Sequence, residues 1–166
     1  IVDGPARYPQ ATWSSLAGYV NYQQRLSDKL MLQAGARYNL IDLDAEFDTR
    51  FYPFPFTTAE INNGALTGSL GVTLSPNEKW AFSLNGSTGF RSPNVDDAGK
   101  VFDSEPGFVI VPNPDLKPEY AYNVEASIAT KLSKQIKLDL TGYYTYLDQA
   151  LVRRDCTLNG QDSIIY

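Results

Sequence analysis

The feature that most constrains this chain is alternating polarity, interrupted by three short polar turns that resemble one another. The turns lie at residues 26–30, 74–80 and 132–136, and each begins with Leu-Ser. Runs in which apolar and polar residues alternate flank every turn, a pattern that predicts β-hairpins. The expected connections between hairpins are much longer, at about 48–65, 93–118 and 153–163. The sequence therefore predicts antiparallel hairpins in series, with short turns at one end and long loops at the other.

The residues after the second turn show the alternation most clearly. One register is apolar with aromatic ends: Trp80, Phe82, Leu84, Gly86, Thr88 and Phe90. The opposite register, from Ala81 to Arg91, is small and polar. Ten residues at about 3.3 Å each, tilted by about 40°, rise about 25 Å, the height of the apolar band of a membrane barrel. Aromatic residues gather at the long-loop ends of such faces: Tyr38, Phe90, Tyr120, Tyr122, Tyr144 and Tyr146.

These patterns predict an all-β fold, an antiparallel up-and-down meander that forms part of a transmembrane β-barrel. Six strands are expected near 11–25, 29–45, 66–74, 79–92, 119–132 and 136–152. A seventh is expected to begin at Ser163. Closed single-chain barrels start at about eight strands, and open edges leave backbone groups unpaired. We therefore expect residues 1–166 to be a fragment of a barrel wall, with its long loops facing outward.

Composition excludes several kinds of site. The chain has no His, so neither a Ser–His–Asp set nor an imidazole-based metal centre is available. The formal net charge of -5 argues against a nucleic-acid partner. The clusters Asp96–Asp97 and Asp42, Asp44 and Glu46 are interpreted as solvated charge. No cofactor, metal or catalytic residue is expected, and Cys156, the single cysteine, has no partner in the chain.

One expected loop is unusually aromatic. Its aromatic residues are Phe51, Tyr52, Phe54 and Phe56, with prolines between them. Exposed aromatics at this density usually mark recognition, so these four are the candidate ligand contacts. The alternative is that they pack against neighbouring loops or at the membrane interface.

Two segments carry a family resemblance. Phe90-Arg91-Ser92-Pro93-Asn94 ends one expected strand, and 113–119 (Asn-Pro-Asp-Leu-Lys-Pro-Glu) begins the next. Together they resemble the two boxes that recur in the barrels of TonB-dependent receptors. The residues concerned are Phe90, Arg91, Pro93, Asn94, Asn113, Pro114, Asp115, Leu116, Lys117, Pro118 and Glu119. We expect these boxes to brace the loop-to-strand junction; a direct role in ligand contact or in triggering transport is the alternative.

Two further stretches extend the resemblance. Residues 32–38 resemble a strand of the same receptors, and the segments 151–155 and 159–163 are similar to receptors of the Bacteroidetes type. The resemblance implies a large barrel in the bacterial outer membrane, embedded in lipid and plugged by an N-terminal domain that this chain lacks. The lumenal Arg37, Arg91 and Glu125 are expected to form salt bridges with one another or with that plug.

The function implied by the resemblance is energised uptake of a scarce nutrient, driven by the TonB system through the absent plug. An iron–siderophore or a similar nutrient is the expected cargo, with haem, cobalamin and glycans as the other classes that such receptors import; the sequence does not identify the ligand. Haem receptors of this family commonly have a His between the two boxes, and its absence here weakens the case for haem uptake. Two alternatives stay open: a small stand-alone barrel acting as a pore or adhesin, and a soluble all-β carbohydrate-binding module.

Overall fold

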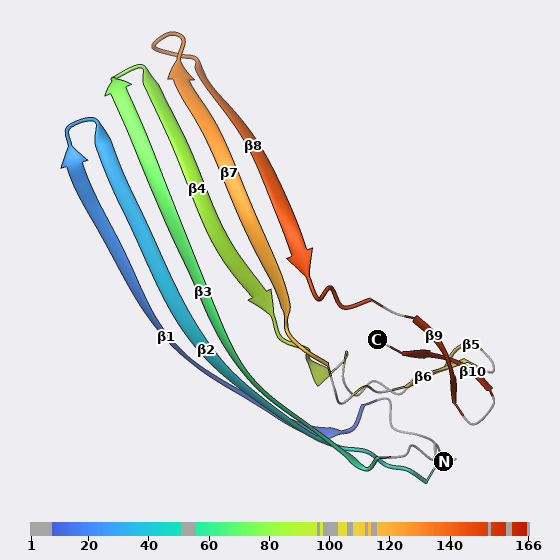
Figure 1. Cartoon of the computed structure of the whole chain (residues 1–166). Helices are drawn as coiled ribbons and strands as arrows, with labels where there is room; N and C mark the ends of the chain where they lie inside the picture. The colour runs from blue at the N-terminus through green and yellow to red at the C-terminus, as the bar shows by residue number, and fades with distance from the viewer. Residues whose placement is uncertain are drawn as a thin grey trace.

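The chain forms one large antiparallel sheet and one small mixed sheet (Figure 1). The computed structural model describes residues 8–50, 56–95, 97, 103–105, 108–111, 113, 116–152, 154–158 and 161–165. Neighbours in the large sheet follow the order β1-β2-β3-β4-β7-β8. Its strands are β1 Gln10–Ser27, β2 Leu30–Glu46, β3 Thr58–Asn77, β4 Trp80–Arg91, β7 Glu119–Lys131 and β8 Lys137–Asp148. This all-β, antiparallel meander confirms the predicted fold class. The sheet is not closed, because β1 and β8 are its two ends.

The strands differ in length. β3 begins at Thr58 and pairs with β2 from Glu46↔Thr58 onward. The alternation in the sequence predicts this strand only from residue 66, so the connection after β2 is shorter than expected. β3 and β4 separate beyond the pair Ser69↔Ser87, whereas β4 pairs with β7 along its whole length, from Trp80↔Thr130 to Arg91↔Glu119. As a result β1, β2 and β3 continue together beyond the rest of the sheet, as a three-stranded arm (Figure 1).

The three short turns are stabilised in the same way. In each, one side-chain oxygen accepts a hydrogen bond from the backbone N–H two residues further on. The Ser27 hydroxyl accepts from Lys29 at 3.3 Å, the Asn77 carbonyl oxygen from Lys79 at 2.9 Å, and the Ser133 hydroxyl from Gln135 at 3.2 Å. Such local bonds replace ladder bonds and favour turns over continued strand. The serine of the shared Leu-Ser pair is the acceptor in the first and third turns, whereas Asn77 takes this role in the second.

The two faces of the large sheet differ in polarity. One face carries large apolar side chains that remain exposed, among them Leu70 at 60%, Leu84 at 53% and Leu140 at 68%. Residues of the other register, such as Ser83 and Asn85, are small and polar. The accessible surface is 11496 Å², whereas a compact monomer of 18.4 kDa would expose about 8,000 Å². The apolar face is therefore an uncovered layer. No helix among the described residues is long and apolar enough to cross a membrane.

The polarity of the two faces inverts along β2. The register that is apolar from Leu30 to Leu40 becomes acidic at Asp42, Asp44 and Glu46, which are exposed. The opposite register becomes apolar and buried, with Ile41 at 8% exposed, Leu43 at 1% and Ala45 at 5%.

The polarity of the two faces inverts at the same height on both neighbouring strands, β1 and β3. On β1, Leu16, the partner of Leu40, is the last apolar residue before Ser14 and Thr12. On β3 the change falls between Leu66 and Asn62, while Ile61 and Ala59 turn to the buried side. The arm therefore has its apolar core on the face that is polar in the rest of the sheet.

The long connections contain a second sheet of order β5-β6-β10-β9. Its strands are β5 Asp103–Glu105, β6 Phe108–Val111, β9 Arg154–Leu158 and β10 Gln161–Ile165. In Figure 1 it lies at the loop end of the molecule, beyond the end of β8. β10 runs parallel to β6 and antiparallel to β9. The strand expected from Ser163 therefore exists but belongs to this small sheet, and its partner is not β8.

Candidate functional site: the loop end and the inward face

The segment that follows β4 covers the buried face of the arm. Leu43 and Ile61 form a small apolar cluster, and Val95 packs against it. Pro93 is among the largest fully buried side chains, and the Asn63 amide donates to the Ser92 hydroxyl at 3.3 Å. The chain after β4 thus lies against the arm and occupies the space opened where β3 and β4 separate.

The first box holds this segment in place. The Arg91 guanidinium donates to both carboxylate oxygens of Asp97, at 2.8 and 2.6 Å. Asn94 and Asp97 cap each other: the Asn94 N–H donates to the Asp97 carboxylate at 3.2 Å, and the Asp97 N–H to the Asn94 side-chain oxygen at 3.0 Å. The side chain of Asp97 is only 5% exposed. The interpretation of Asp97 as solvated charge was therefore wrong, because it missed the capping spacing between positions 94 and 97.

The second box meets the first through strand pairing. Arg91, the last residue of β4, is the direct partner of Glu119, the first residue of β7. The Glu119 carboxylate accepts a hydrogen bond from the backbone N–H of Leu151 at 2.9 Å. Each box therefore braces a junction: the first fixes the start of the β4–β7 connection, and the second fixes the chain after β8.

For the other residues of the second box, the structure gives the extent of burial. Asn113, Leu116 and Pro118 are half-buried and Lys117 is exposed. Pro114 and Asp115 lie outside the described residues. A role of the boxes in ligand contact or in triggering transport stays a prediction.

Of the four candidate aromatic contacts, the structure describes Phe56 alone. Its ring meets that of Phe47 edge-on, with centroids 5.4 Å apart, and it packs on the cluster of Ala45, Phe47 and Ala59. Phe51, Tyr52 and Phe54 lie outside the described residues. Phe56 takes the packing role that was the alternative to recognition.

Aromatic rings form a continuous row at the loop end of the apolar face. Phe90 contacts Tyr120, Tyr120 contacts Tyr122, and Tyr122 contacts Tyr146, with centroids 6.3, 6.4 and 6.3 Å apart. The row crosses β4, β7 and β8. Its tyrosines combine an apolar ring with a polar hydroxyl, which suits the boundary between an apolar layer and water.

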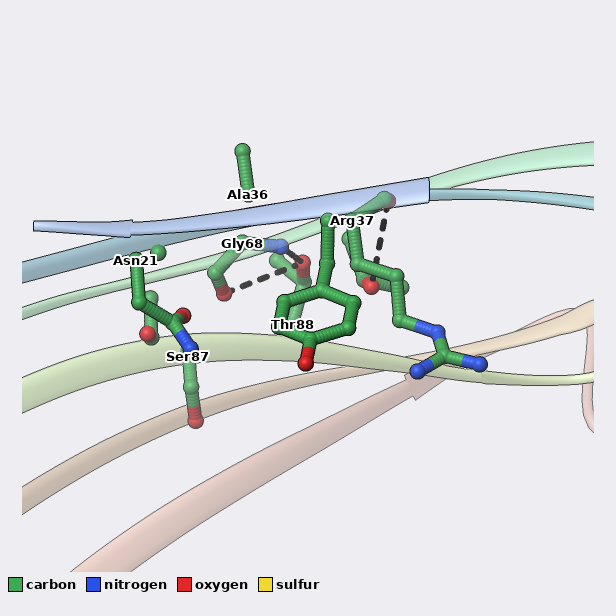
Figure 2. A pocket seen from close by; sticks show the side chains of 10 residues that line it. Asn21, Ala36, Arg37, Gly68, Ser87 and Thr88 are labelled. Atoms are coloured by element: carbon green, nitrogen blue, oxygen red, sulfur yellow. Dashed lines mark hydrogen bonds between the residues drawn. The ribbon is translucent and has the colours of Figure 1, made fainter. Parts of the chain in front are cut away.

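The opposite, inward face has a shallow depression of about 370 Å³ across β1 to β4. Arg37 and Asn21 project into it, whereas Ala36 points to the other side of the sheet (Figure 2). Part of the rim is fixed by hydrogen bonds between strands, in which the Gly68 N–H donates to the Thr88 hydroxyl at 2.8 Å.

Among the described residues, Arg37, Arg91 and Glu125 form no salt bridge with one another, and their pairing with a plug stays a prediction. Arg91 bonds Asp97, as above, and Arg37 donates from its Nε to the Asn39 side-chain oxygen at 2.7 Å. Over the residues that the structure describes, no group of three or more His, Cys, Asp or Glu is placed to hold a metal ion. The described geometry is thus that of a braced wall with a polar inner surface.

Comparison with known families gives one match that covers nearly the whole chain. The sequence profile described as "TonB dependent receptor-like, beta-barrel" matches residues 2–164. The matched region includes both boxes and the full length of every strand of the large sheet.

Two curated relatives are similar over part of their length. Hemoglobin-haptoglobin utilization protein B of Neisseria meningitidis serogroup C is 27% identical over 155 residues, which cover 87% of this chain and 18% of that protein. Probable hemoglobin and hemoglobin-haptoglobin-binding protein 4 of Haemophilus influenzae is 40% identical over 60 residues, 36% of this chain and 6% of that protein. The chain therefore spans less than a fifth of either relative.

Proposed function

The chain belongs to the TonB-dependent receptor β-barrel family, and from this premise we propose that it is a section of the wall of an outer-membrane receptor for energised nutrient uptake. The observation that carries the proposal is the family match over residues 2–164. Proteins of this family are receptors and transporters. The uncovered apolar face, bordered by the row of rings from Phe90 to Tyr146, supports contact with outer-membrane lipid.

The unpaired edges support a larger assembly. β1 and β8 end the large sheet, and a sheet edge in lipid leaves backbone donors and acceptors without partners. We propose that further strands of the parent receptor pair with both edges, and that a plug domain of the same parent connects the barrel to the TonB system.

For the cargo we propose an iron-bearing nutrient. Both relatives are named for haemoglobin and its haptoglobin complex, which favours haem iron carried by protein over the iron–siderophore expected from the sequence. Because this chain has no His, a histidine ligand to haem iron would have to come from elsewhere in the receptor. The part assigned to this chain is therefore wall and loop scaffold.

Growth on defined iron sources tests the proposal. A strain lacking the parent gene should fail to grow on haemoglobin as sole iron source and should still grow on a ferric siderophore. Complementation with the parent gene should restore growth only in cells with an intact TonB system. If the deletion strain grows on haemoglobin but fails to grow on the siderophore, the cargo is a siderophore. Growth on both iron sources without the gene and without TonB would refute the receptor assignment.

A further inference from the structure

We propose that the inward face of β1 to β4 contains a binding site for a carboxylate group, centred on the guanidinium of Arg37. Arg37 lines the depression of about 370 Å³ on that face. The inference adds a chemical class of ligand to the receptor assignment, and it rests on that assignment only for naming this face the inner one.

The charge of Arg37 is not neutralised by the wall. Its Nε donates to the Asn39 side-chain oxygen, and over the described residues no acceptor is found for its two terminal nitrogens. The depression has no Asp or Glu in its lining. A guanidinium remains charged at any physiological pH, and its planar fork matches the two oxygens of a carboxylate.

Asn39 adds an observation at the residue bonded to Arg37, beside the depression and outside its lining. It is 6% exposed, and its side-chain Nδ2 has no hydrogen-bond partner among the described residues. The orientation of this amide follows from chemistry, because a guanidinium can only donate and the amide oxygen must therefore face Arg37. A buried donor without an acceptor costs free energy, so the polar groups around Arg37 are short of an acceptor.

The other polar groups of the depression suit an acceptor-rich ligand. Tyr19, Asn21 and Ser69 contribute a phenol, an amide and a hydroxyl, each with a hydrogen to donate. Gly35 keeps the floor open, because a Cβ there would lie 2.9 Å from the Asn21 side-chain oxygen and 3.1 Å from the Ser69 hydroxyl. The result is a cradle of donors around one fixed positive charge.

The carboxylate has two possible sources: a molecule that enters the barrel, or another segment of the parent receptor. The experiment uses the whole receptor in detergent, with citrate as the probe in titration calorimetry and with thermal unfolding measured in parallel. Arg37→Gln removes the charge. Arg25→Gln is the matched control, because Arg25 lies in the same register of β1 as Tyr19 but near the turn end.

If the site is open to solutes, citrate should bind the wild type, and Arg37→Gln should weaken that binding by at least about tenfold. Arg25→Gln should leave it unchanged. Asn39→Asp should also abolish binding, because it places a carboxylate of the wall itself beside Arg37. This last variant keeps the test valid if Arg37→Gln does not fold.

If a segment of the receptor already fills the site, citrate should not bind the wild type. Arg37→Gln should then lower the unfolding temperature more than Arg25→Gln does, and Arg37→Lys should restore part of the loss. Absence of citrate binding together with equal unfolding temperatures for the two glutamine variants would overturn the proposal. Neither readout requires transport, so this outcome would leave the uptake assignment untouched.

Discussion

Arg91 and Glu119 are direct partners at the loop end of β4 and β7, yet the side chain of each bonds a residue in a different connection. Arg91 reaches Asp97, and Glu119 accepts from the backbone of Leu151. Opposite charges at adjacent strand ends thus brace two different connections. The two boxes, far apart in sequence, form one structural unit at the point where the long loops leave the sheet.

The pair between Arg91 and Asp97 should contribute to stability because Asp97 is buried. Asp97→Ala removes the guanidinium's partner and one half of the reciprocal cap with Asn94. We expect the free energy of unfolding to fall by about 1–3 kcal/mol. Denaturant unfolding of the receptor in detergent measures this, with the exposed Asp44→Ala as control. An equal effect of the two substitutions would contradict a bracing role for Asp97.

The bond from Leu151 to Glu119 should protect that amide from exchange. Glu119→Ala removes the acceptor, so hydrogen exchange at Leu151 should accelerate, with a stability loss of about 1.5–3 kcal/mol because the acceptor is charged. Glu119→Gln retains an acceptor oxygen and should cost less. Exchange followed by mass spectrometry tests the order of the three proteins; unchanged protection in Glu119→Ala would count against the contact.

The stability of the arm should depend on the residues of its buried, apolar face and not on those of its exposed face. Leu43 is 1% exposed, so Leu43→Ala should lower the free energy of unfolding by about 2–5 kcal/mol. Its neighbour Asp42 points to the opposite, exposed side, and Asp42→Ala should stay within about 0.5 kcal/mol. Comparable losses for both would show that the arm does not have a buried and a solvated face.

Orientation of the wall can be tested with two adjacent residues. Leu84 lies on the apolar face and Ser83 on the polar one. Leu84→Arg should destabilise the receptor by about 2–4 kcal/mol near the middle of a bilayer, whereas Ser83→Arg should be tolerated. Folding yield into lipid vesicles measures both. Equal yields would mean that the Leu84 face does not contact lipid.

The Asp48 carboxylate, in the turn after β2, should stay ionised in mild acid. Arg50 donates to the Asp48 side chain from its guanidinium and its backbone, and these bonds lower the pKa of Asp48 to about 2. A lowered pKa means that the stabilisation is complete above the unfolded value of about 3.9 and is lost as the pH falls through about 2. Carboxyl NMR shifts of Asp48 should therefore titrate with a midpoint well below the unfolded value of about 3.9. Arg50→Gln should return the Asp48 midpoint toward the unfolded value.

The wall strands were predictable because, over the height of the apolar layer, each has one face that is apolar. The early start of β3 was not predicted, since the polarity of its two registers inverts near Leu66 and the buried residues Ala59 and Ala65 are small. An inversion read across β1, β2 and β3 together would have revealed it. The small sheet was missed because β6 and β10 pair in parallel across a long sequence separation, which leaves no local pattern.

The candidate site was predicted in part. The contacts of Arg91, Asn94 and Glu119 are those of a brace, while the role of the boxes in the receptor stays a prediction. That Arg91 and Glu119 would be partners depends on the register of β4 against β7, which the sequence does not specify. The unpaired amide of Asn39 likewise follows from three-dimensional burial, because nothing in the alternation distinguishes it from other inward residues.

The three matching turns have a consequence for how the molecule assembles. Each turn joins strands that are adjacent in sequence, so the pairs β1–β2, β3–β4 and β7–β8 need little loop closure and should form within microseconds. Pairing of β4 with β7 must instead close the long connection from Arg91 to Glu119, which is slower. We therefore expect the hairpins to be the kinetic units of this wall, and the bonds of Arg91 to Asp97 and of Leu151 to Glu119 each fix the loop end of one unit.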